Sequence, residues 1–247
     1  MDRYRGRVAV VTGASQGVGA AVARQLLRQG LTVVGLARRP DKVKALELKE
    51  APGKLHAIQT DISSEDSIVS AFKWIKDNLG GVDVLVNNAA VFPAAPVASG
   101  KTEDWKSILD VNVLGLSICT REAVQDMLRR GVDDGFIIHI NSDLGHLPPF
   151  GTDRAMYGAS KHAVRVLLEG LRKDLVARGS KIRVGEISPG AIRTEGLMDV
   201  MQEFPEIAKT IPCMEPEDIA EAVVYMLSQH PRVQVYDIIM YPTGRPV

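Results

Sequence analysis

The chain has little of several features that mark specialised classes of protein. Only two of its 247 residues are cysteine, Cys119 and Cys213, and neither stands in a CxxC pair or beside a cluster of histidines. This pattern provides neither a disulfide framework nor a zinc site, so we expect no metal. Lys and Arg together number 30, as do Asp and Glu. The resulting zero net charge gives no indication of a nucleic-acid partner.

Long hydrophobic runs are also missing. The longest unbroken apolar stretch is six residues, Ala222 to Leu227, far below the roughly 20 residues that a membrane-spanning helix needs. The first residues, MDRYRGRVAVV, pass directly into a short β-like run, without the apolar region and small-residue cleavage site of a secretory leader. We therefore expect a protein without a membrane span, in the reducing setting of the cytoplasm.

What the chain does have is a regular alternation of short apolar runs and longer helical stretches. Continuous apolar strands separated by helices predict a parallel sheet that is covered on both faces. The strands are expected at 7–12, 31–36, 55–60, 82–86, 136–141, 182–187 and 233–240, and the helices at 20–29, 42–49, 64–78, 105–130, 157–178 and 216–228.

No low-complexity linker, internal repeat or block of charge divides this pattern. We therefore predict an α/β fold: one Rossmann-like, doubly wound domain over residues 1–247. Two segments, 143–156 and 191–213, are longer than simple connections, and we expect them to be irregular loops around a substrate. Their apolar side chains could contact a lipophilic substrate or pack against the core, and these are Leu147, Phe150, Met156, Leu197 and Met198.

The stretch TGASQGVG, residues 12–19, lies between the first expected strand and the first expected helix. Gly13 allows a tight turn, Gly17 lets the backbone approach a pyrophosphate, and Gly19 permits close packing of the helix on the sheet. The spacing differs from G-x-G-x-x-G, and three glycines could also simply reverse the chain. The strand before and the helix after favour nucleotide binding.

The residues after the second expected strand decide which dinucleotide is preferred. A carboxylate there accepts hydrogen bonds from the ribose 2′-OH of NAD, whereas a guanidinium pairs with the 2′-phosphate of NADP. This chain has Arg38 and Arg39 there, and no acid before Asp41. A solvated pair of charges at a helix start is the alternative, but helix N-termini disfavour cations. The sequence therefore predicts NADP(H).

Tyr157 and Lys161 lie four residues apart in the stretch YGASK, so both side chains project from one helix face. An ammonium beside a phenol favours the phenolate, so we expect the pKa of Tyr157 to fall below its usual value of about 10. Such a tyrosine can exchange protons at neutral pH. The pair could also be a surface lysine over a half-buried ring.

Three further polar positions could each have a structural or a functional role. Asp61, after the third expected strand, could cap a helix or contact an adenine. The stretch NNAA at 87–90 could close the sheet or lie against a ribose. His146 could contact a substrate, or serve as a structural hydrogen-bonding residue.

Six motifs occur in a characteristic order: TGxxxGxG, NNA[G/A], the Asn112 of DVNVLG, the Ser142 of INSDLGH, YxxxK, and the turn SPG at 188–190. In these motifs the chain resembles the short-chain dehydrogenase/reductase family over essentially its whole length. The phrases LSICTREA, VDDG and EISPG further resemble an animal subgroup, the dehydrogenase/reductase member 11 type, which includes insect farnesol dehydrogenases.

The resemblance implies roles for individual residues. Tyr157 would give and take the proton, with Lys161 as its electrostatic partner and as a ligand of the nicotinamide ribose. Ser142 would orient the substrate oxygen, and Asn112 would hold a water that links the lysine to solvent. The cofactor would contact Gly13, Ser15, Gly17, Val18 and Gly19 at its phosphates, Arg38 and Arg39 at its 2′-phosphate, Asp61 and Ile62 at its adenine, Asn88 at a ribose, and Pro189, Gly190, Ile192 and Thr194 at its nicotinamide.

The same resemblance implies an NADP(H)-dependent oxidoreductase, usually a homodimer or homotetramer. It would move hydride between the nicotinamide and a lipophilic ketone or alcohol, such as a steroid, an isoprenoid alcohol or a small carbonyl compound. Two other functions stay open. One is reduction of a carrier-bound 3-ketoacyl group, which needs a basic docking patch such as residues 129–130 and 172–173. The other is a non-catalytic nucleotide-binding regulator.

Overall fold

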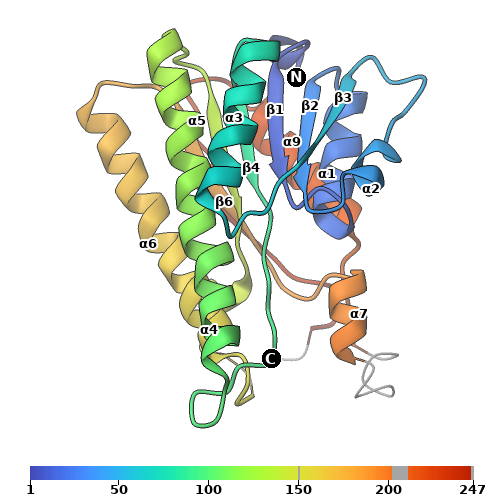
Figure 1. The fold of residues 1–247 in the computed structure, drawn as a ribbon, viewed down its shortest axis with the longest axis vertical. Helices are drawn as coiled ribbons and strands as arrows, with labels where there is room; N and C mark the ends of the chain where they lie inside the picture. The colour runs from blue at the N-terminus through green and yellow to red at the C-terminus, as the bar shows by residue number, and fades with distance from the viewer. Residues whose placement is uncertain (150, 202–210, 246–247) are drawn as a thin grey trace.

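Seven strands run parallel in one sheet in the part of the chain that the structure describes, residues 1–149, 151–201 and 211–245 of a computed structural model. The strands are β1 (Val8–Thr12), β2 (Thr32–Ala37), β3 (Lys54–Gln59), β4 (Val84–Asn87), β5 (Phe136–Ile140), β6 (Arg183–Pro189) and β7 (Asp237–Met240). They follow one another across the sheet in the order β3-β2-β1-β4-β5-β6-β7. Figure 1 shows β3, β2, β1 and β4 in this order. The predicted doubly wound parallel sheet is confirmed.

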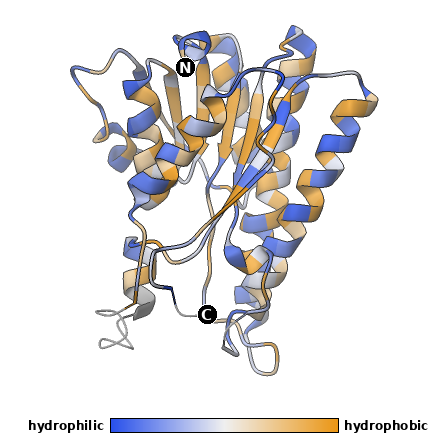
Figure 2. Cartoon of the chain, turned by 180° about the vertical axis from the view of Figure 1, so that it is seen from behind, coloured by the Kyte–Doolittle hydropathy of each residue, from blue (hydrophilic) through white to orange (hydrophobic). Residues whose placement is uncertain are grey.

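Helices cover both faces of this sheet. They are α1 (Gly17–Arg28), α2 (Pro40–Lys44), α3 (Glu65–Leu79), α4 (Thr102–Leu109), α5 (Leu116–Arg130), α6 (Ala155–Ala177), α7 (Glu195–Met201) and α9 (Pro216–Ser228). One core cluster joins the sheet to α1, α2 and α9, and a second joins it to α3, α5 and α6. Figure 2 shows the hydrophobic strands enclosed between these two layers. Among the described residues, no helix is both long and apolar enough to cross a membrane.

The strand order reverses between β1 and β4, which pair directly, with Ala9 opposite Val84. Connections leave β1 towards β2 on one side, whereas those from β4 lead to β5 on the other. The carboxyl ends of β1 and β4 therefore diverge into a crevice, which is the usual place for a ligand in an open α/β sheet. The glycine turn after β1 and the NNAA stretch after β4 both lie at this point.

Two expected elements are shorter by three residues or more in the structure than the sequence predicts. The helix expected over 42–49 is the five-residue α2, which has Pro40 at its first position and is followed by turns that bury Leu46. The strand expected over 233–240 begins only at Asp237. The side chain of Arg183 donates to the carbonyl of Val233 at 3.1 Å, which occupies a group that a longer strand would use in its ladder.

The long helix expected over 105–130 begins earlier, at Thr102, and is interrupted. Between α4 and α5 the residues Asp110–Gly115 form a π-helical segment. Asn112 lies within it and is almost fully buried. π-Helical turns are wider than α-helical ones and are frequent at functional sites.

The prediction that 143–156 and 191–213 are irregular was wrong in part. Asp143–Gly145 forms a 3-10 turn that Ser142 caps, and α6 already begins at residue 155. In the second segment, Thr194 accepts a hydrogen bond from the amide of Leu197 at 3.2 Å and so caps α7. Helix α7 lies beyond the carboxyl edge of the sheet (Figure 1). The expected contact of Phe150 lies outside the described residues, as do 202–210.

Candidate active site

A cleft of about 680 Å³ runs along the carboxyl ends of β1 to β4. Most of the residues predicted to bind a cofactor line it. They are Gly13, Ser15, Gly17, Val18, Arg38, Arg39, Asp61, Ile62, Asn88 and Thr194. The other predicted cofactor residues do not line this cleft, and these are Gly19, Tyr157, Lys161, Pro189, Gly190 and Ile192.

The glycine turn has a shape that side chains would obstruct. Gly13 and Gly17 have φ angles of +66° and +53°, in the left-handed region that favours glycine. A Cβ on Gly13 would lie 2.9 Å from the Cα of Ala89. A Cβ on Gly19 would lie only 2.5 Å from both the side-chain nitrogen of Asn88 and the carbonyl oxygen of Gly13. The turn therefore depends on glycine for close approach to the β4 loop.

Thr12 and Asn88 join the ends of β1 and β4. The hydroxyl of Thr12 accepts hydrogen bonds from the amides of Asn88 and Ala89, each at 3.0 Å. In return, the side-chain amide of Asn88 donates to the carbonyls of Thr12 at 2.9 Å and Gly13 at 3.3 Å. These four bonds fix the width of the crevice. No role for Thr12 was predicted from the sequence, although this residue directly precedes the first glycine.

Positive charge gathers at one end of the cleft. Arg38 and Arg39 are both exposed, and neither takes part in an ion pair among the described residues. Arg39 donates to the side chain of Gln16, the residue that directly precedes α1. Hydrogen bonds from Ser63, and then the charge of Arg38, lower the pKa of Asp61. Two guanidinium groups beside a helix N-terminus form a suitable environment for a phosphate.

Lys161 and Tyr157 lie together at the start of α6. The ammonium of Lys161 is 5.7 Å from the centroid of the Tyr157 ring and donates to the carbonyl of Ile140 at 2.9 Å. Lys161 is only 3% exposed. Burial lowers its pKa to about 8, an effect that the negative charge of Glu186 partly opposes.

The expectation that the lysine lowers the pKa of Tyr157 was wrong for this structure. Desolvation raises the pKa of the phenol to about 12, even though the residue as a whole is only half-buried. The nearby hydroxyl of Ser142 opposes this rise, the charge of Asp143 adds to it, and the charge of Arg154 opposes it. The physical reason is that burial disfavours the charged form of both partners in the pair.

Asn112 uses its amide to join the π-helical segment to two neighbours. Its oxygen accepts from the amide of Val91 at 2.9 Å, and its nitrogen donates to the carbonyl of Val91 at 2.9 Å and to Ser160 at 3.1 Å. Ser160 in turn donates to the carbonyl of Tyr157 at 2.7 Å. Both N–H groups of the amide are thus occupied. The role of Asn112 in holding a water stays a prediction.

Phe92 connects the cleft to the tyrosine and was not singled out from the sequence. Its ring lines the cleft and meets the ring of Tyr157 edge-on, with 5.9 Å between centroids. The guanidinium of Arg154 donates to the carbonyl of Phe92 at 2.6 Å. The available signal was an aromatic residue two positions after the NNAA stretch.

Ser142 is almost fully buried beside Tyr157. Its hydroxyl accepts from the amide of Leu144 at 3.2 Å and donates to the carboxylate of Asp143 at 3.1 Å. That carboxylate also lies 3.1 Å from the guanidinium of Arg245. No role for Asp143 or Arg245 was predicted from the sequence, in which they stand 102 positions apart.

His146 lies in a polar cluster behind the lysine. Its Nε2 is 2.9 Å from the hydroxyl of Ser188, 3.4 Å from Asp237 and 3.9 Å from Glu186. One potential metal-ligating atom from each of the histidine and the two acids falls within 4.8 Å of the others. Burial, and then the charge of Asp237, raises the pKa of Glu186 to about 7. These contacts favour the structural reading of His146.

Comparison with known proteins gives the same result along almost the whole chain. Residues 7–204 match the family model described as short chain dehydrogenase. The chain is 47% identical over 251 residues to Dehydrogenase/reductase SDR family member 11 of Bos taurus, covering 98% of each protein. It is 44% identical over 248 residues to farnesol dehydrogenase of Aedes aegypti, covering 99% of each. A solved metagenomic short-chain oxidoreductase in complex with NADP has a TM-score of 0.79 and 31% identity, covering 98% of this chain and 99% of that one.

Proposed function

Because the chain belongs to the short-chain dehydrogenase family, an oxidoreductase family that acts on alcohol and carbonyl groups, we propose that it exchanges hydride between NADP(H) and a lipophilic ketone or alcohol. The observation that carries this proposal is the paired arrangement of Tyr157 and Lys161 next to a cleft with two arginines at its end. A regulator that only senses nucleotide has no need of a buried lysine beside a tyrosine.

The residues of the cleft fit an extended phosphorylated dinucleotide. A Cβ on Gly13 or Gly19 would collide with the residues that follow β4, so glycine is needed at both positions for the tight turn. Such a turn at a helix N-terminus lets backbone amides approach a pyrophosphate. Arg38 and Arg39 would hold the 2′-phosphate, since neither is paired with a carboxylate among the described residues. When bound, NADP(H) supplies or accepts the hydride. A relative solved with NADP supports this choice of cofactor.

The protein's own part in the reaction is to hold the substrate oxygen and move its proton. Ser142 and Tyr157 lie side by side, so both hydroxyls can contact one carbonyl oxygen. Charge that develops on that oxygen during reduction is stabilised by donors already in place. Tyr157 then gives its proton to the oxygen. The high pKa of the phenol keeps it protonated until that moment, and Lys161 is near enough to stabilise the resulting phenolate.

Apolar residues on the two segments beyond the sheet support the proposed substrate class. Leu147 and Met156 come from one segment and Leu197 and Met198 from the other, and all four are half-buried. They would form the walls of an apolar substrate site, with 143–156 and 191–213 as its two sides. The farnesol dehydrogenase relative supports an isoprenoid alcohol within this class, alongside steroids and small carbonyl compounds.

A panel assay tests the function. Hydrophobic ketones, isoprenoid aldehydes and the matching alcohols are supplied with NADPH or NADH, or with their oxidised forms, and turnover is followed at the nicotinamide absorbance. We expect NADPH-dependent turnover of at least one lipophilic carbonyl compound. Binding of NADPH without turnover of any member would instead support a non-catalytic regulator.

Reduction of a carrier-bound ketoacyl group is less well supported. The basic residues that could dock an acidic carrier already have partners within the chain. Arg130 lies 2.8 Å from Asp126, and Arg172 and Lys173 lie 2.8 and 3.5 Å from Glu169. Comparing a free ketone with its carrier-bound equivalent in the same assay separates the two functions.

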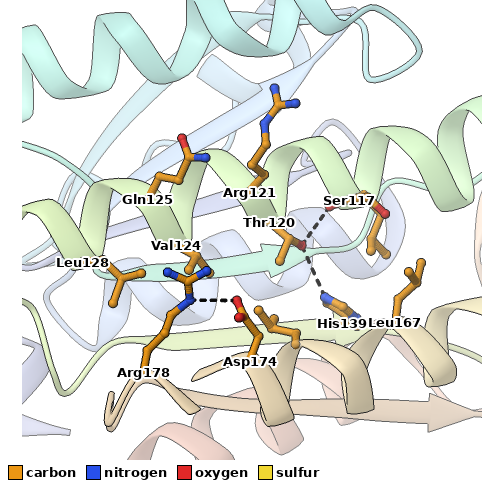
Figure 3. A pocket seen from close by; sticks show the side chains of 12 residues that line it. Ser117, Thr120, Arg121, Val124, Gln125, Leu128, His139, Leu167, Asp174 and Arg178 are labelled. Atoms are coloured by element: carbon orange, nitrogen blue, oxygen red, sulfur yellow. Dashed lines mark hydrogen bonds and ion pairs between the residues drawn. The ribbon is translucent and has the colours of Figure 1, made fainter. Parts of the chain in front are cut away.

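A second copy of this chain is the partner that we propose for the outer face of α5 and α6. A groove of about 350 Å³ runs between these helices, with Asp174 and Arg178 paired at one end (Figure 3). Val166 and Leu167 on α6 are 73% and 39% exposed. A homodimer or homotetramer would cover this apolar surface.

We also propose a cytoplasmic location. Both cysteines are free thiols in the structure, and burial raises the pKa of Cys119 to about 12, which keeps that thiol protonated and unreactive. Unpaired cysteines are typical of reducing compartments. Cell fractionation with an antibody against the protein tests this placement.

A further inference from the structure

Asp143 is a buried carboxylate beside Ser142 that the proposed reaction does not use. Its side chain is 5% exposed. A buried carboxylate needs partners, because the loss of its hydration is costly. Asp143 has two: the hydroxyl of Ser142 donates to one oxygen at 3.1 Å, and the guanidinium of Arg245 lies 3.1 Å from the other.

The hydroxyl of Ser142 has a single proton and more than one acceptor within reach. Its lone pairs already accept from the amide of Leu144 at 3.2 Å. Its proton points to Asp143 in the structure, whereas substrate binding requires it on the side of Tyr157. A hydrogen bond to a full carboxylate charge is about twice as strong as one to a neutral carbonyl. Without a neutralising partner, Asp143 would therefore hold the hydroxyl proton of Ser142 in a hydrogen bond to itself.

Arg245 is held where it can neutralise that charge. It comes from the segment after β7, and its guanidinium lies 4.0 Å from the centroid of the Tyr241 ring. The ring packs over the turn after β6, since a Cβ on Gly190 would lie 3.2 Å from Tyr241 and 3.7 Å from Asp143. The arginine is thus sandwiched between an aromatic face and the carboxylate.

We propose that Arg245 is a positioning residue that neutralises Asp143 and thereby releases the proton of Ser142 to the substrate oxygen. The inference rests on the proposed oxidoreductase function and adds one residue pair to it. The segment after β7, which carries Arg245, would thereby help to orient the hydroxyl of Ser142. Loss of the arginine removes the ion pair of Asp143 and leaves the hydroxyl of Ser142 as its remaining side-chain partner among the described residues.

The test uses Arg245→Gln, Arg245→Lys and the double variant Asp143→Asn with Arg245→Gln. Arg7→Gln is the matched control. The side chain of Arg7 is 29% exposed, as is that of Arg245. Arg7 also pairs with a carboxylate, that of Asp134 at 2.7 Å, and lies over an aromatic ring, that of Tyr4 at 5.8 Å. It precedes β1, however, and so lies at the amino ends of the strands, away from the cleft. The readouts are kcat and KM for a carbonyl substrate found in the panel, the Kd for NADPH, and the melting temperature.

We expect Arg245→Gln to lower kcat for the carbonyl substrate by about 10-fold or more, the loss of one charge-assisted hydrogen bond, with the Kd for NADPH unchanged. Arg245→Lys should keep most of the rate, because it keeps the charge. The double variant should regain rate over Arg245→Gln, since no carboxylate remains to hold the proton. Arg7→Gln should not change kcat.

Two results would overturn the proposal. Equal kcat values for Arg245→Gln and Arg7→Gln would mean that the pair does not affect the serine. A double variant as slow as Arg245→Gln, with a normal melting temperature, would mean that Arg245 acts by packing and not through Asp143. Either result leaves NADPH-dependent turnover by the wild-type protein intact, whereas an inactive wild-type protein would overturn the proposed function itself.

Discussion

The ammonium of Lys161 lies 5.7 Å from the centre of the Tyr157 ring, yet its hydrogen bond goes to the carbonyl of Ile140. The lysine is therefore fixed by the sheet and not by the phenol. Burial also lowers the pKa of Lys161 to about 8, so the ammonium loses its proton before the phenol of Tyr157 does as the pH rises. The pair is arranged to stabilise a phenolate once it forms, and not to create one in advance.

Replacement of the tyrosine tests its role as the proton donor. Tyr157→Phe removes the hydroxyl and leaves the ring that packs against Phe92, so NADPH should bind with a near-normal Kd while turnover is lost. Tyr225→Phe, at an exposed position on α9, is the control and should retain full activity. Substantial turnover by Tyr157→Phe would assign the proton to another group.

Replacement of an arginine tests the choice of cofactor. Arg38→Ala should raise the KM for NADPH by about 10- to 150-fold, which corresponds to one charge-assisted hydrogen bond of about 1.5–3 kcal/mol. The KM for NADH should stay the same, because NADH has no 2′-phosphate. Arg232→Ala, exposed after α9, is the control. An unchanged KM for NADPH would move phosphate recognition elsewhere in the cleft.

The glycine turn can be tested at a position without backbone strain. Gly19→Ala places a Cβ 2.5 Å from Asn88 and from the carbonyl of Gly13, so it should weaken NADPH binding and lower the melting temperature. Gly170→Ala on α6 meets no atom within 4 Å and should stabilise the helix by about 0.5–1 kcal/mol. Fluorescence titration with NADPH and thermal melts measure both. Normal NADPH binding by Gly19→Ala would contradict the described turn.

The buried Glu186 should make stability depend on pH. Its pKa is raised from 4.5 to about 7, so its favourable contribution is complete below pH 4.5 and is lost as the pH rises through about 7. Glu186→Gln cannot ionise and should lose less stability than the wild type between pH 5 and 8, by on the order of 2 kcal/mol. Urea unfolding at both pH values measures this.

The control for that experiment is Glu221→Gln, an exposed position on α9, which should follow the wild-type pH dependence. Identical slopes for Glu186→Gln and the wild type would show that the carboxylate of Glu186 ionises in the folded protein as it does in the unfolded chain.

The apolar surface of α6 should control assembly. Leu167→Asp places a charge beside the groove between α5 and α6 and should reduce the molar mass measured by light scattering after size exclusion. Val97→Asp, an exposed position in the loop before α4, should not. A wild-type protein that elutes as a monomer would rule out the proposed dimer face.

Much of the fold could be predicted because its signals are local. The run VAVVT, the glycines at 13, 17 and 19 and the stretch NNAA each specify a strand, a turn or a strand end within a few residues. Two parallel strands place their carboxyl ends at one edge, so the meeting of Gly13 and Asn88 follows from topology. The motif residues on α6 follow from helical spacing in the same way.

The parts that could not be predicted depend on contacts between distant residues. The pairing of Asp143 with Arg245 has no local pattern, and neither does the contact of Phe92 with Tyr157. The sign of the pKa shift on Tyr157 is a property of its burial, which spacing does not encode. Helix α7 was not predicted, although Thr194, which caps it, was a local signal in the sequence.

The position of β1 inside the sheet, between β2 and β4, affects how this protein reaches its native state. Its partner β4 lies 75 positions later, since Ala9 stands opposite Val84. Until that strand has been synthesised, one edge of β1 has no neighbour, and its buried residues stay unprotected. Sheets built from such non-local pairings fold slowly and expose aggregation-prone edges on the way. Nascent chains that end before residue 84 should therefore depend most on chaperones.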